Sequence, residues 1–138
     1  MDMATKTVIN LMYTSRVIEE RILGCLKPFE ISTQQYNVLR ILRGQKNNPC
    51  NVSELQSRMI DKNSNTTRLI DKLLTKGLVK RQVCQQNRRK VELFITTKGL
   101  TTLDQLDPII LKANQDLLKQ LGNSQLEILN TQLNTIRN

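Results

Sequence analysis

The chain has 138 residues, of which 38% are hydrophobic and 24% are charged, which is typical of one globular domain with its own core. It contains no histidine and three cysteines without a CxxC spacing, so neither a zinc site nor a disulfide framework is indicated. We expect no catalytic residues, no metal and no cofactor. No apolar run is long enough to span a membrane and no signal peptide is recognisable, so we expect a cytoplasmic protein.

The net charge of +9 is concentrated in one segment. Between Arg58 and Lys98 there are eleven lysine and arginine residues but three aspartate and glutamate residues, so this segment carries +8. A charge this localised indicates a polyanionic partner.

The first part of the chain predicts two helices. Residues 5 to 26 place apolar side chains at helical spacing, and Gly24 and Pro28 mark the end of that helix. A second helix begins at Ser32, because Ser32 and Gln35 have the spacing of a capping box. A polar turn follows at residues 44 to 49.

A helix-turn-helix is predicted next. Asn51 and Glu54 cap a short helix that ends near Met59, and a turn at residues 60 to 62 leads to a helix over residues 63 to 76. The first turns of this second helix are polar, and its apolar stripe comes later in the segment. Gly77 is well placed as the residue that follows its end.

Residues 78 to 84 and 90 to 95 predict a two-stranded hairpin, whose tip at residues 85 to 89 has no apolar side chain. We call this hairpin the wing. The fold class is therefore mainly α with a small β-hairpin wing, a winged helix-turn-helix flanked by N- and C-terminal helices.

The C-terminal part is predicted to be helical. One helix starts at Thr96 or Thr97 and extends to about residue 120, and Pro108 should kink or divide it. After a break at Gly122, the residues Ser124 and Glu127 have capping-box spacing for a last helix.

The start of the residue 63 to 76 helix carries side chains suited to DNA. Asparagine can bond bidentately to adenine and arginine to guanine, while serine and threonine can bond bases or phosphates. The predicted DNA contacts of this helix are Asn63, Ser64, Asn65, Thr67 and Arg68. The alternative is that these residues only cap the helix and face solvent.

The wing tip adds three consecutive cations. We predict that Asn87, Arg88, Arg89 and Lys90 reach the minor groove or the phosphates. The alternative is a solvated charge run that keeps an edge hairpin soluble. Helix and wing together favour double-stranded DNA as the partner. A protein-protein module that binds an acidic partner with the same basic face is the second hypothesis. An enzyme lacks support, because no nucleophile-base pair or paired carboxylates are evident.

Several segments resemble the MarR (multiple antibiotic resistance regulator) family of winged-helix transcription regulators. They are ISTQQYNVL, NVSELQSRM and TRLIDKLLTKGLVKR, and the resemblance covers roughly residues 31 to 100. The wing of the family has the pattern Asp, any residue, Arg, followed further on by Leu-Thr. The corresponding positions in this sequence are Asn87, Arg89, Ile95 and Thr96. Asn87 departs from the family, in which the Asp is thought to orient the wing Arg by an ion pair.

The resemblance implies a dimeric regulator of palindromic DNA, in most cases a repressor released by a small aromatic ligand. It divides the single domain of residues 1 to 138 into a reading unit, residues 31 to 100, and dimerisation helices at residues 1 to 30 and 101 to 138. The apolar stripes of these terminal helices would then pack in a homodimer. The alternative is one intramolecular core.

The resemblance also raises redox sensing, because some relatives sense peroxides with a cysteine in the N-terminal helical region. Cys25 is the candidate here. The alternative is that Cys25 is a small buried hydrophobic residue, since the chain has no histidine that could activate a thiol.

Overall fold

The computed structural model describes all residues from 1 to 138, as six α-helices, one short 3-10 helix and one hairpin. The elements are α1 (Met3–Leu26), η1 (Lys27–Phe29), α2 (Thr33–Gly44), α3 (Val52–Arg58), α4 (Thr66–Thr75), β1 (Val79–Val83), β2 (Val91–Ile95), α5 (Thr97–Leu118) and α6 (Asn123–Arg137). This confirms the predicted fold class, a mainly α chain with a small wing.

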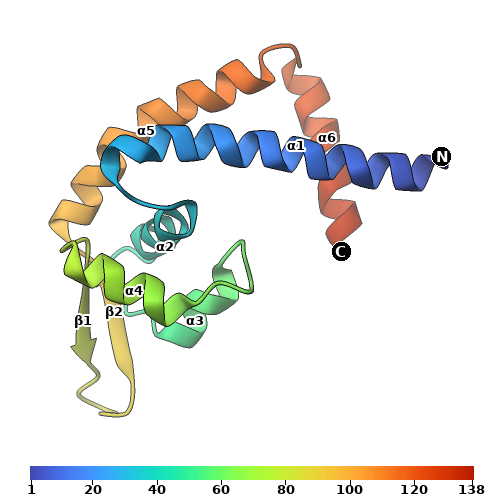
Figure 1. The fold of residues 1–138 in the computed structure, drawn as a ribbon. Coiled ribbons are helices and arrows are strands. Elements are labelled where there is room, and N and C mark those ends of the chain that lie inside the picture. Colours follow the sequence, from blue (N-terminus) through green and yellow to red (C-terminus); the bar gives the residue numbers. More distant parts are fainter.

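The elements form two regions (Figure 1). Helices α2, α3 and α4 and the β1-β2 hairpin lie together, and the long helices α1 and α5 pass over one side of them. The start of α5 continues from β2, whereas α6 lies at the far end of α5, away from the hairpin. None of the helices combines the length and apolarity needed to cross a bilayer.

Local caps explain where several helices begin and end. The Ser32 hydroxyl accepts from the Gln35 amide at 3.0 Å, and the Gln35 side chain accepts from the Ser32 amide at 2.9 Å, which confirms the capping box of α2. The Asn51 side chain accepts from the Glu54 amide at 2.8 Å at the start of α3. Gly77 has a φ of 72°, which lets the chain leave α4 in the left-handed conformation that glycine tolerates.

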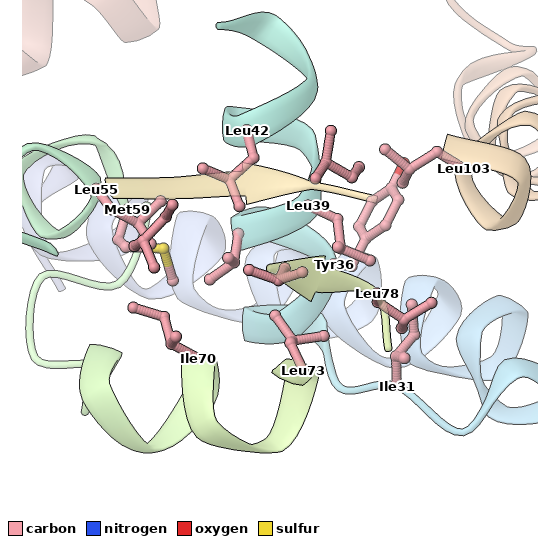
Figure 2. Packing of buried hydrophobic residues seen from close by; sticks show 14 of the residues in the cluster. Ile31, Tyr36, Leu39, Leu42, Leu55, Met59, Ile70, Leu73, Leu78 and Leu103 are labelled. Carbon is pink, nitrogen blue, oxygen red and sulfur yellow. The ribbon is translucent and has the colours of Figure 1, made fainter. Parts of the chain in front are cut away.

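The core lies around α2 (Figure 2). It contains 18 buried hydrophobic residues, which come mostly from the reading unit, with Leu26 from α1 and three residues from α5. The side chains of Ile70 and Leu73 point from α4 toward α2, where Leu39 is fully buried. This packing fixes α4 against the rest of the reading unit while leaving its other side to solvent.

An isolated bridge supports the wing. The Leu93 amide of β2 donates to the Cys50 carbonyl at 2.8 Å, so the chain just before α3 pairs with the hairpin. The antiparallel register of the hairpin pairs Val79 with Ile95 and Val83 with Val91. The base of the wing is therefore tied to the core, and its tip is not.

Two sequence expectations need correction. Helix α4 begins at Thr66 rather than 63, because Asp61 accepts from the Asn63 amide with its side chain and from the Ser64 amide with its carbonyl, which makes a turn of these residues. Helix α6 begins at Asn123, and the side chain of Gln125 accepts from the Gly122 amide at 2.9 Å, so the predicted Ser124-Glu127 capping box is wrong.

Of the two outcomes predicted for Pro108, a kink or a division, the structure shows the kink (Figure 1). Helix α5 is not divided there but runs through it as one element. The helix does change direction near its middle (Figure 1). A proline ring removes one backbone hydrogen bond and crowds the preceding turn, which bends a helix without ending it when packing holds both halves.

Candidate nucleic-acid interface

The start of α4 presents most of the predicted helix residues to solvent. Asn65 is the N-cap, and its side-chain oxygen accepts from the Arg68 amide at 3.2 Å. Asn63, Asn65, Thr67 and Arg68 are exposed and Ser64 is half-buried. Asn63 and Ser64 belong to the turn before the helix, so the predicted set spans a turn and a helix start.

Thr66 differs from its neighbours, because it is 4% exposed and lies against the core. The exposed Arg68 therefore stands on the outer side of α4, opposite Ile70 and Leu73, and the exposed Thr67 lies on the flank between the two sides. A helix docked by its apolar side and free on its polar N-terminal side has the form that major-groove reading requires.

The wing tip is cationic and free of ion pairs. Arg88, Arg89 and Lys90 are exposed, and none of them takes part in any of the four ion pairs of the chain. The Asn87 side chain accepts from the Arg89 amide at 3.1 Å, so it holds the backbone of Arg89 rather than its guanidinium. The position at which the family has an aspartate thus still shapes the tip here, without a charge.

Further cations lie between the helix start and the wing. Arg81 of β1 approaches Asp71 of α4 at 4.0 Å, and both side chains are more than half exposed, so this pair is weak. Helix α4 and the hairpin face away from α1 and α5 (Figure 1). The basic surface is therefore on the side of the molecule opposite the long helices.

A surface hollow of about 290 Å³ separates the start of α2 from the start of α4. Its lining residues are Ser32, Gln34, Gln35, Ser64, Asn65, Arg68, Leu69 and Lys72. Sequence reasoning included three of these residues and missed the α2 side, because residues 32 and 64 are brought together only by the fold. The capping box at Ser32 was the one available signal, since it leaves other amides of that helix start unpaired.

Comparison with known proteins identifies the fold and a family resemblance. Residues 31–91 match the family model described as the MarR family. A solved MarR transcription factor from Planctomyces limnophilus is 28% identical, covers 98% of each chain and has a TM-score of 0.75. The segment of residues 31–91 is therefore similar to the MarR family. The family is one of transcription regulators.

Two other MarR-like proteins are informative. The HTH-type transcriptional repressor IacR of Pseudomonas putida is 25% identical over 111 residues, which is 80% of this chain, and the chain spans 65% of that protein's length. A solved structure that concerns the regulation of DNA binding of Bordetella bronchiseptica BpsR by 6-hydroxynicotinic acid is 15% identical. It covers 96% of this chain and 99% of that one, with a TM-score of 0.84, which shows a shared fold.

The three cysteines of the chain lie apart from one another. Cys25 is half-buried at the end of α1, and Cys84 is half-buried beside the wing tip. Cys50 is fully buried, and burial raises the pKa of its thiol. No three residues among cysteine, aspartate and glutamate come together in a way that could hold a metal ion.

The terminal helices leave apolar side chains uncovered. Helix α1 buries Leu26 alone, and α6 buries no residue. Met12 of α1 is 67% exposed and Ile128 of α6 is 59% exposed, together with many of their apolar neighbours. Apolar area of this extent on two helices indicates an interface.

Proposed function

We propose that the chain is a sequence-specific DNA-binding transcription regulator, a dimeric repressor that a small ligand releases from DNA. The observation that carries this proposal is the exposed, unpaired polar start of α4 beside an unpaired cationic wing tip, on one side of a rigid core. In this proposal the chain binds DNA in the cytoplasm and is not an enzyme.

The proposed division of labour follows from geometry. Arg68 on α4 reads a base edge or holds a phosphate, and Thr67 stands beside it. Asn63, Ser64 and Asn65 complete the contact from the turn. Arg88, Arg89 and Lys90, with Asn87 holding the turn, bring positive charge to the backbone or the minor groove.

The homodimer is proposed from the apolar faces of α1, α5 and α6. The second half of α5 also exposes apolar side chains, with Leu111 at 56%. A two-fold dimer would present two α4 helices to a palindromic site about 34 Å apart, one turn of the duplex. Residues 1 to 30 and 101 to 138 would form the interface, and residues 31 to 100 would read DNA.

Ligand release is proposed from one of the similar structures. In BpsR, 6-hydroxynicotinic acid regulates DNA binding. A small aromatic ligand that binds one arrangement of the two reading units better than the other would shift the dimer away from DNA by that difference in affinity.

The test is a salt titration on a duplex selected from a random pool and on a scrambled duplex of the same composition. Arg68→Ala should lose roughly 1–3 kcal/mol on the selected duplex and relax the preference at one position. Arg89→Ala should weaken both duplexes alike and lower the salt slope by about one.

Lys46→Gln removes the same charge and serves as the matched control, because Lys46 is exposed in the turn after α2, outside the proposed DNA contacts and the proposed dimerisation helices. Asn65 is a poorer choice than Arg68, since its replacement by alanine would also remove the cap of α4. If Arg68→Ala and Arg89→Ala both bind like the control, DNA reading fails, and an acidic protein partner becomes the better hypothesis.

A further inference from the structure

The hollow between α2 and α4 has an unpaired helix start on one wall. Within the first turn of α2, the Ser32 amide donates to the Gln35 side chain and the Gln35 amide donates to the Ser32 hydroxyl. The amides of Thr33 and Gln34 have no acceptor, because the first N–H groups of a helix have no partner within it. These two N–H groups and the positive end of the helix dipole favour an anion.

One buried polar group without a partner lies on the wall of the same hollow. The Ser64 hydroxyl is buried and has no hydrogen-bond partner. Buried polar atoms are nearly always satisfied, so this hydroxyl indicates a missing partner. On the opposite wall, Gln35 uses its side-chain oxygen to accept from the Ser32 amide, and its side-chain NH₂ donates to no acceptor in the chain.

The charge of the lining is entirely positive. Arg68 and Lys72, which lie one turn apart on α4, both line the hollow. Neither forms an ion pair with a carboxylate. No aspartate or glutamate lines the hollow. All its free donors therefore suit one compact anion with several acceptor oxygens.

We propose that this hollow holds a backbone phosphate of the bound DNA. The Thr33 and Gln34 amides and the Gln35 side chain would bind it from α2, and Lys72 and the Ser64 hydroxyl from the α4 side. The inference rests on the proposed DNA-binding function and extends it to a helix outside the helix-turn-helix.

The position of the hollow favours a DNA phosphate over a free anion. Asn65 and Arg68, which are proposed to face the duplex, also line the hollow. A duplex close enough for Arg68 to reach a base edge therefore brings its strand past the hollow. Two anchors on one strand, the hollow and the wing tip, would fix the angle at which α4 enters the groove.

The test uses Gln34→Glu and Lys72→Gln in the full chain, measured on the selected and the scrambled duplex over a range of salt. Gln34→Glu places a carboxylate against the hollow, yet an acidic residue in the first turn favours helix formation, so α2 should stay folded. We expect Gln34→Glu to weaken both duplexes on the order of ten-fold, as loss of a charge-assisted contact would. Lys72→Gln should lower the salt slope by about one.

The matched control is Asn48→Asp, which adds the same charge at an exposed site beyond the other end of α2. If the parent binds both duplexes, and Gln34→Glu and Lys72→Gln bind like Asn48→Asp, the phosphate assignment is wrong while the proposed function stands. If the parent binds neither duplex, the proposed function itself fails.

A second measurement separates a DNA phosphate from a free one. The amide resonance of Gln34 should shift when duplex is added and should not saturate with inorganic phosphate at millimolar concentration. Saturation by inorganic phosphate, with Gln34→Glu binding duplex like the control, would assign the hollow to a free anion and overturn the proposal.

Discussion

Two asparagines set the backbone at the proposed DNA-contacting arginines. The Asn65 side chain accepts from the Arg68 amide, and the Asn87 side chain accepts from the Arg89 amide. Each asparagine thereby uses its acceptor on the backbone and leaves the arginine side chain free. An aspartate at 87 could compete for the guanidinium of Arg89, so asparagine leaves the full charge of the wing tip for a partner.

At Gly99, helix α5 lies close against the base of the wing. A Cβ at this position would lie 2.4 Å from the Leu78 carbonyl oxygen and 2.6 Å from the Cγ1 atom of Ile95. Gly99→Ala should therefore lower the free energy of unfolding by about 1–3 kcal/mol, as overpacking does. Urea denaturation of the two proteins measures this difference in the free energy of unfolding.

Gly44→Ala is the control for that substitution, because nothing lies within 4 Å of the new Cβ at the end of α2. It should leave stability unchanged or raise it by up to about 1 kcal/mol, since alanine is the better helix former. Equal effects of the two substitutions would contradict the close approach at Gly99.

The three thiols should react at different rates. Burial raises the pKa of Cys50, so little of this thiol is present as thiolate. The contribution of the buried neutral thiol to stability is fully present below the usual thiol pKa and decreases as the pH rises beyond it. In the folded protein at pH 8 a thiol reagent should label Cys25 and Cys84 promptly and Cys50 only on unfolding. Cys50→Ala should give the same number of labelled thiols with and without denaturant.

The redox alternative is tested on the same proteins. We expect a mild hydroperoxide to leave duplex binding unchanged in the parent and in Cys25→Ser. Release of DNA from the parent alone would establish Cys25 as a sensor.

At the scale of elements, local spacing predicted most boundaries because the caps are local. The Ser32-Gln35 and Asn51-Glu54 pairs act over three residues, so the starts of α2 and α3 were readable. The start of α4 was not, because the polar run before it contains several residues able to cap. The Asp61 side chain decides the turn by bonding the Asn63 amide.

The hollow was beyond sequence reasoning for a different reason. Its two walls are some thirty residues apart in the chain, and the core packing of α2 against α4 alone brings them together. Which side of each helix is buried can be predicted, but not which two exposed corners will meet. The apolar faces of the terminal helices were readable, since helical spacing was enough to find them.

One ion pair links the reading unit to a proposed dimerisation helix. Arg43 of α2 donates to both carboxylate oxygens of Asp107 on α5, at 2.8 and 3.2 Å, and these bonds raise the pKa of Arg43. Both side chains are partly exposed, so a double-mutant cycle with Arg43→Gln and Asp107→Asn should give a coupling of about 0.2–1 kcal/mol in stability.

The larger effect of that pair should be on geometry. We expect the pair to fix the angle between the reading unit and α5. The parent should then bind the selected duplex better than a duplex whose half-sites are moved by one base pair. Arg43→Gln should bind the two duplexes nearly equally. The pair Arg16 and Glu20 lies within α1, so Arg16→Gln is the control. Equal discrimination by Arg43→Gln and the parent would assign the pair to stability alone.

Over the whole molecule, burial is divided unevenly. The core cluster belongs to the reading unit, the end of α1 and the first half of α5. Most of α1 and all of α6 depend on another surface for their apolar contacts. A helix of this length without packing is marginal in water, so we expect α1 and α6 to gain packing in the proposed dimer.

The proposed dimer predicts a sedimentation mass of about twice the chain mass of 15.9 kDa at micromolar concentration. Val8→Glu combined with Met12→Glu should dissociate it, because both exposed apolar side chains lie on one face of α1. Asn10→Glu adds charge two residues from each, on the opposite face, and should leave the mass unchanged. A parent that sediments as one chain and still binds a palindromic duplex tightly would refute the dimer.

The lack of any buried residue in α6 also bears on how long two protomers stay together. Backbone amides of an unpacked helix exchange with solvent as the helix frays, so in the dimer the α6 amides exchange when the partner departs. The Leu93 amide, bonded to the Cys50 carbonyl inside the core, exchanges only on global unfolding. The rate of deuterium uptake along α6 would therefore measure the rate at which the two protomers of the proposed dimer dissociate. The same rate would limit how fast protomers of two different dimers can mix.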